Sequence, residues 1–182
     1  MKTVIKTVIK ALRGIDAFLT AILKWLTIAC FSALTLIVTA NVLLRIFPIT
    51  SLHWTDEITE LLFAALVFYG AAAVWMAKGH FSVGDWIGKF AKGERAKSAY
   101  RLLLEIVGLG FALILFKYSL SLSLRTGEAT AVFQIPKKVL YSCMPISSLI
   151  MIAYSAAFIV RGAIGIASPE ALRAFEEALA EA

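Results

Sequence analysis

Four long apolar runs dominate this sequence and restrict it to folds that lie in a membrane. Residues 25–44 form a run of twenty without a formal charge, and a helix of that length spans about 30 Å, the thickness of a bilayer's hydrocarbon core. The other runs cover 61–77, 102–124 and 139–160. The chain is 60% hydrophobic and only 16% charged, whereas a soluble domain is about half apolar and about a quarter charged.

These runs predict an all-α membrane protein with four transmembrane helices in a single domain over residues 1–182. The predicted spans are 25–46, 56–77, 100–124 and 139–161. The basic residues indicate the orientation, because thirteen of the eighteen lie before the first span, from the end of the second span to the first residues of the third, or from the last residue of the fourth onward. Positive charge is retained in the cytoplasm, so both termini and the middle loop are expected there. We attribute the basic excess to contact with membrane lipids and expect no nucleic-acid partner.

Two segments are predicted to lie on the membrane surface as amphipathic interfacial helices. In residues 1–20, basic side chains recur at steps of three or four residues while apolar side chains fill the opposite face, which is typical of a helix at the headgroup layer. In 82–97, a sequence signature typical of a helix N-terminus is followed by apolar residues on one helical stripe, among them Trp86. An ordinary cytoplasmic loop is the alternative for this second segment. The tail, 168–182, reads as a short acidic helix without an evident role.

Few residues in the chain are suited to chemistry, and we expect no enzyme, cofactor or metal site. The only histidines, His53 and His80, lie beyond the two ends of the second span, on opposite sides of the membrane, which disfavours haem ligation across a bundle. His53 has helical spacing with Asp56 and Glu57 but no second histidine or cysteine nearby, so metal binding is disfavoured. Cysteines at 30 and 143 are expected to be small buried residues.

Two further classes of function stay open as alternatives. A self-sufficient small oligomeric transporter would need ionisable groups in mid-membrane. The third span carries Glu105 and Lys117, but about 18 Å of helix separates them, too far for pairing. A four-helix membrane enzyme would need a reactive cluster, and the basic group around Tyr100 is better explained as a solvated loop.

Polar residues concentrate between the first two spans, in the stretch 41–57. The residues singled out are Asn41, Arg45, Trp54, Asp56 and Glu57. Trp54 is typical of an aromatic belt, Thr55 is a candidate helix cap, and the two acids that follow suit the first turn of a helix. An ion pair from Arg45 to these acids could close the first hairpin. The stretch is therefore predicted to be a hairpin clamp and a periplasmic docking edge.

Two further groups complete the candidate residues. Gly70, Ala71, Ala72 and Ala73 are small enough to let helices approach closely. They could pack on a partner subunit, or equally within this chain. Lys78, His80 and Trp86 are expected to form an interfacial turn after the second span.

The order of these motifs resembles the small membrane subunit, DctQ-type, of tripartite ATP-independent periplasmic (TRAP) transporters. The matching elements are the 41–57 polar residues, then 69–72, 78–83, 134–136, and Tyr141 with 145–147. The resemblance covers roughly residues 20–165. Phe81, where an aliphatic residue is commoner, and the short loop at Pro48 depart from the pattern.

The resemblance implies a scaffold in the bacterial inner membrane that packs against a large TRAP membrane subunit. In such systems the large subunit carries the substrate and sodium sites and moves as an elevator. A periplasmic substrate-binding protein delivers an organic acid, often a dicarboxylate or a sialic acid. The small subunit would widen the stationary part and offer periplasmic surface for docking.

Overall fold

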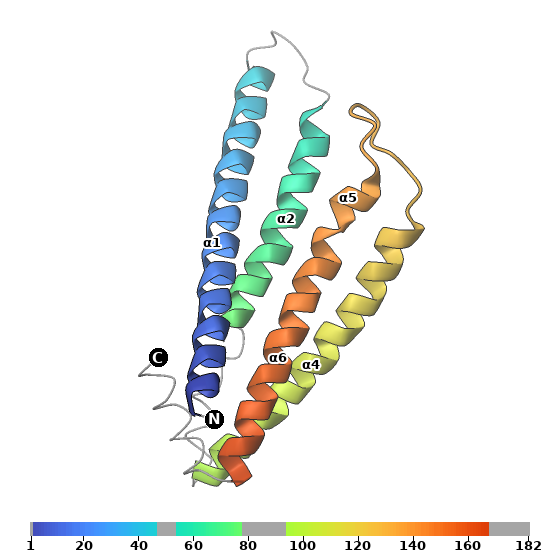
Figure 1. Cartoon of the computed structure of the whole chain (residues 1–182). Helices are drawn as coiled ribbons and strands as arrows, with labels where there is room; N and C mark the ends of the chain where they lie inside the picture. Colours follow the sequence, from blue (N-terminus) through green and yellow to red (C-terminus); the bar gives the residue numbers. More distant parts are fainter. Residues whose placement is uncertain (1, 47–53, 78–93, 168–182) are drawn as a thin grey trace.

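The computed structural model describes residues 2–46, 54–77 and 94–167, and within them it is built from helices (Figure 1). The helices are α1 (Lys2–Ile46), α2 (Thr55–Met76), α4 (Glu94–Arg125), α5 (Lys137–Tyr141) and α6 (Cys143–Ala167). Four segments of the described chain are long and apolar enough to cross a membrane: 14–46, 55–76, 102–125 and 137–163. The predicted fold class, an all-α membrane protein with four spans, is confirmed.

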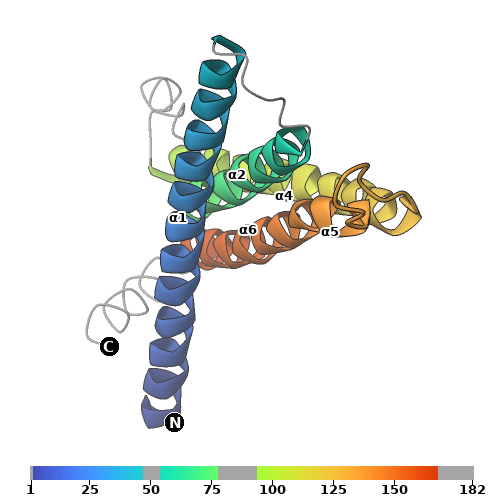
Figure 2. The same cartoon turned by 90° about the horizontal axis from the view of Figure 1, so that it is seen from above.

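Helix α1 is continuous from Lys2 to Ile46, so the segment predicted as a separate interfacial helix and the first span are one helix. Gly14 does not break it, because a single glycine in a helix costs only about 1 kcal/mol. At 1.5 Å per residue α1 is about 68 Å long, more than twice the hydrocarbon core. Figure 2 shows α1 crossing the other helices rather than running along them. Whether its first turns lie in the interface remains a prediction.

The other spans begin and end close to their predicted positions. Helix α2 (Thr55–Met76) lies one residue from the predicted 56–77. Helix α4 begins at Glu94, ahead of the predicted residue 100, so the last residues of the proposed 82–97 interfacial helix are the first turn of α4. The rest of that segment and the 168–182 tail lie outside the described residues.

The helices meet around a small apolar core drawn from α1, α2, α4 and α6. Its members are Leu23, Ala72, Trp75, Ala112 and Met151. Trp75 stacks on Phe111 with ring centroids 6.5 Å apart, and its indole Nε1–H donates a hydrogen bond of 2.9 Å to the Ser155 hydroxyl. Because a buried indole N–H needs an acceptor, Ser155 lets the largest core side chain lie inside the bundle.

Helix α6 is the central element of the packing, since α4 and α2 both lie against it while α1 packs chiefly on α2. Figure 1 shows the order α1, α2, α6, α4 across the molecule. Helix α6 is suited to this position because Ser147, Ser148 and Ser155 are completely buried. Small side chains let helices approach closely in a membrane. The hydroxyls of Ser147 and Ser148 donate to the Met144 carbonyl, each at 2.9 Å.

Most large apolar side chains point outward. Phe18, Trp25, Phe31 and Leu36 on α1 are each at least 60% exposed, and α4 carries a similar row. A soluble monomer rarely exposes apolar surface of this extent, whereas hydrocarbon solvates it without cost. The exposed side chains and the four spans together indicate a multi-pass membrane protein.

Candidate interaction site at the loop end

Several of the described polar contacts between separate segments lie at one end of the bundle, which we call the loop end. There α1 ends at Ile46, α2 begins at Thr55, and the 126–136 loop joins α4 to α5 (Figure 1). Because the spans stop here, backbone groups at this end need partners other than helical ones. The candidate residues of the 41–57 stretch that the structure describes also lie at this end.

Glu57, in the first turn of α2, is hydrogen-bonded to the backbone of the 126–136 loop. One carboxylate oxygen accepts the backbone N–H of Val132 at 2.5 Å, and the other accepts that of Phe133 at 3.1 Å. Trp54 packs edge-on against the Phe133 ring, with centroids 6.4 Å apart. The loop is thereby joined to α2 through one polar and one aromatic contact.

The 126–136 loop is itself a closed turn. The Thr130 N–H donates to the Ile135 carbonyl at 2.9 Å, and the buried Thr130 hydroxyl accepts the Ile135 N–H at 3.1 Å. Gln134 has a φ of 54°, a left-handed conformation that costs energy in most residues. Held by these hydrogen bonds, that conformation reverses the chain and leads it back toward α5.

Glu128 and Lys137 close the base of this loop. The Lys137 N–H donates to the Glu128 carbonyl at 3.0 Å, and its ammonium lies 2.7 Å from the Glu128 carboxylate. The hydrogen bond from Lys137 and its positive charge hold the pKa of the Glu128 carboxyl below its ordinary value. The side chain of Glu128 is 75% exposed, so the contact contributes little stability.

The structure does not bring Arg45 to the acids of α2. Among the described residues, no hydrogen bond or ion pair joins Arg45 to Asp56 or Glu57, and both Arg45 and Asp56 are exposed. Neighbouring helical positions point about 100° apart, and Glu57 faces the 126–136 loop. The contact that the structure shows at the start of α2 joins Glu57 to that loop, and the hairpin clamp stays a prediction. Asn41 is half-buried near the end of α1.

The cap of α2 also differs from the prediction. Trp54 occupies the cap position, and its side chain makes no capping hydrogen bond. Thr55, which the sequence suggested as the cap, is instead the first helical residue and is buried.

The small-residue patch lies largely inside the chain. Ala72 is completely buried in the core, and Ala71 and Ala73 pack against it. A side chain carbon added at Gly70 would lie 3.6 Å from Thr27 on α1, so Gly70 faces that helix. This arrangement matches the alternative in which the patch packs α2 within the chain. Lys78, His80 and Trp86 lie outside the described residues.

Sequence reasoning missed two contacts that join distant segments. One is the clamp from Glu57 to Val132 and Phe133. The other lies toward the opposite end, where the Tyr154 hydroxyl of α6 donates to the Asp16 carboxylate of α1. An acid at the start of α2 was a visible signal, but no local pattern identifies its partner. In residues 2–46, 54–77 and 94–167, no three His, Cys, Asp or Glu side chains lie close enough together to hold a metal ion.

Four spans around an apolar core, with a polar loop end, define a multi-pass membrane protein. The family model for the DctQ component of tripartite ATP-independent periplasmic transporters matches residues 34–165. The match covers most of the chain and includes α2, α4, α5 and the loop end, and the chain belongs to this family. No curated protein matches the sequence. The resemblance inferred from the order of motifs is confirmed, and the chain is a membrane component of a tripartite transporter.

Proposed function

We propose that this chain is the small, scaffold-type subunit of a sodium-coupled TRAP transporter that imports an organic acid of the dicarboxylate or sialic acid class. It packs against the large elevator-type subunit, and a periplasmic binding protein delivers the substrate. The observation that carries the scaffold role is the core itself. Where the four helices meet, the described core cluster holds no ionisable side chain, and the buried hydroxyls of Ser147, Ser148 and Ser155 are engaged within the chain. A carrier usually buries ionisable groups there.

The distribution of basic residues supports an orientation with both termini in the cytoplasm of a bacterium and the loop end in the periplasm. The outward apolar side chains of α1 and α4 would then be shared between lipid and the large subunit. Ala72 of the small-residue patch is already buried in this chain, which leaves less of that patch for the contact with the large subunit.

Uptake into liposomes tests the scaffold role. The full chain reconstituted alone should not accumulate a labelled dicarboxylate or sialic acid when a sodium gradient is applied. The same liposomes containing the co-expressed large subunit and supplied with the binding protein should accumulate the substrate of that system. Sodium-driven uptake by this chain alone would instead identify a self-sufficient carrier.

The loop end is proposed as a docking edge for the binding protein, and Asp56 tests this part. Its side chain is exposed at the start of α2, so the variant Asp56→Lys should leave assembly intact while reducing uptake several-fold. Glu57→Lys is less suitable, because it also removes the contact with the 126–136 loop. Normal uptake by an assembled Asp56→Lys complex would rule out docking through this residue.

A further inference from the structure

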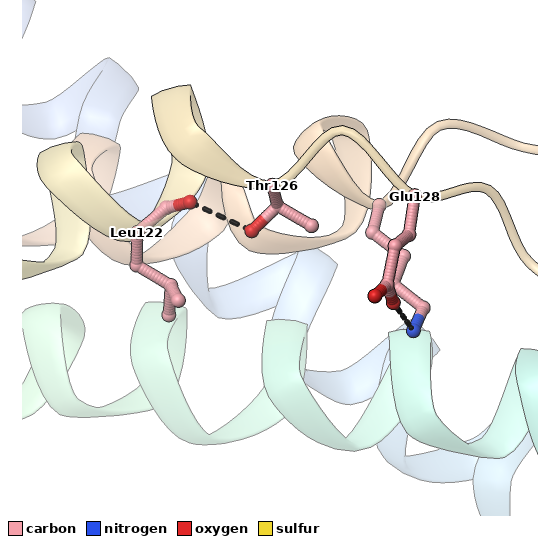
Figure 3. Close-up of polar contacts among 4 residues, drawn as sticks. Leu122, Thr126 and Glu128 are labelled. Atoms are coloured by element: carbon pink, nitrogen blue, oxygen red, sulfur yellow. Dashed lines mark hydrogen bonds and ion pairs between the residues drawn. The ribbon is translucent and has the colours of Figure 1, made fainter.

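A pocket of about 310 Å³ opens at the loop end, between the end of α4 and the start of α5. Its lining consists of Leu122, Arg125, Thr126, Glu128, Lys137 and Tyr141, together with Gly127. Figure 3 shows three of these residues, Leu122, Thr126 and Glu128, at the end of α4 and in the loop that follows it. The pocket lies where a span ends, at the level of the bundle where headgroups meet protein.

Two polar groups close to the pocket are already satisfied by the chain. The Thr126 hydroxyl donates to the Leu122 carbonyl at 2.7 Å (Figure 3), and the Ser123 hydroxyl of the same helix donates to the Lys138 carbonyl at 3.3 Å. These two hydroxyls and the two carbonyls that accept from them therefore need no external ligand as a hydrogen-bond partner.

The basic side chains and the phenol that line the pocket, by contrast, still have hydrogen-bond donors to offer. Arg125 is exposed in the last turn of α4, and Tyr141 is half-buried in α5. In the part of the chain that the structure describes, no hydrogen bond or ion pair involves either side chain. Lys137 gives one of its three N–H donors to Glu128, which leaves two. A guanidinium, an ammonium and a phenol thus line one small space, and the two cations outnumber the single carboxylate.

The apolar surroundings indicate which anion would fit. Leu122 at the edge of the pocket is 46% exposed, and Tyr118, one turn back on the same face of α4, is 68% exposed, so an exposed and largely apolar surface leads from the donors along the span. A ligand with an anionic head and hydrocarbon chains matches both parts. Arg and Lys form strong charge-assisted hydrogen bonds with phosphate oxygens, and a tyrosine hydroxyl can add a third.

We propose that this pocket binds the phosphate of a phospholipid headgroup, held by Arg125, Lys137 and Tyr141, with an acyl chain along Leu122 and Tyr118. Glu128 opposes the anion and weakens the site. The inference depends on the chain spanning a membrane and is independent of the transporter role.

Retention of lipid by the full chain in a neutral detergent tests the proposal, with native mass spectrometry as the measurement. The probes are phosphatidylglycerol, a diacylglycerol with the same chains but no phosphate, and inorganic phosphate without chains. Arg125→Gln should weaken phosphatidylglycerol retention about fivefold, because a basic residue near an anionic headgroup contributes about 1 kcal/mol. Lys138→Gln is the matched control, since Lys138 is an exposed neighbour that does not line the pocket.

Glu128→Gln distinguishes repulsion between this carboxylate and the bound phosphate from a structural disturbance of the loop. Removing this carboxylate should strengthen phosphatidylglycerol retention, whereas a merely structural disturbance would weaken it. Equal retention in wild type, Arg125→Gln and Lys138→Gln would overturn the site. If the diacylglycerol were retained as well as phosphatidylglycerol, the phosphate would not be recognised. If millimolar inorganic phosphate competed as strongly as phosphatidylglycerol, the bound phosphate would not come from a lipid.

Discussion

At the scale of single residues, Glu57 joins two segments that are 75 positions apart in sequence. Its place in the first turn of α2 is evident from the sequence, because an acid there interacts favourably with the helix dipole. Its contact with the Val132 and Phe133 amides is not, because side chain to backbone contacts across such a separation have no sequence pattern. From the sequence, Arg45 was the expected partner of Glu57. In the structure, Glu57 contacts the loop instead.

Removing the Glu57 carboxylate should loosen the 126–136 loop. In Glu57→Ala the amides of Val132 and Phe133 lose their acceptor, so we expect their hydrogen exchange to become several-fold faster in detergent micelles. Asp56→Ala is the matched control, since Asp56 is the exposed neighbour, and it should leave both amides unchanged. Unaltered exchange in Glu57→Ala would contradict the clamp.

The contact between Glu128 and Lys137 predicts a pH dependence of the same loop. Hydrogen bonding from Lys137 and its charge lower the pKa of Glu128 below its ordinary value of 4.5. A carboxyl with a lowered pKa stabilises the folded state above the ordinary pKa, and this contribution disappears as the pH falls through the lowered value. Protection of the loop amides, taken relative to their intrinsic exchange rate at each pH, should therefore fall below about pH 4.5 in the wild type, with a smaller fall in Glu128→Gln. Identical profiles would exclude the contact.

At the scale of elements, the spans were predictable to within a few residues, because hydropathy and flanking charge report where a helix enters a membrane. Helix α1 shows the limit of that reasoning. The basic repeat in residues 1–20 reports which face meets polar surroundings, but not whether the helix bends before the first span. Residues 17–24 contain neither proline nor glycine, so nothing ends the helix there.

The crossing of α2 with its neighbours shows a second limit. Small residues predict close packing, but the sequence could not say whether Ala72 meets a partner subunit or this chain. The buried position makes the contact testable. Ala72→Leu should lower the free energy of unfolding by about 1–3 kcal/mol, because added volume strains a packed core.

Val74→Leu is the matched control for Ala72→Leu, since Val74 lies two positions along α2 with its side chain exposed. Its effect should be close to zero when unfolding is followed in mixed micelles. If Ala72→Leu were as well tolerated as Val74→Leu in the isolated chain, α2 would not pack as described.

At the scale of the whole molecule, a small apolar core holds four spans whose outer faces remain apolar. The class of protein was predictable because mean hydropathy is averaged over long segments. An error of a few residues in a helix boundary therefore does not change the assignment of a span. The loop end was only partly predictable: its location followed from the polar 41–57 stretch, but its main structure comes from residues 126–136. The pocket beside α5 depends on side chains from two helices and a loop, which spacing alone does not bring together.

The central claim is that this chain works as a subunit attached to a larger membrane protein. Affinity purification of the tagged full chain from its native membranes in mild detergent, with mass spectrometry of everything retained, tests it most directly. We expect a large multi-helix membrane protein in near-equal amount, and its loss when the membranes are stripped with harsh detergent. A chain recovered alone, or only with further copies of itself, would contradict the account.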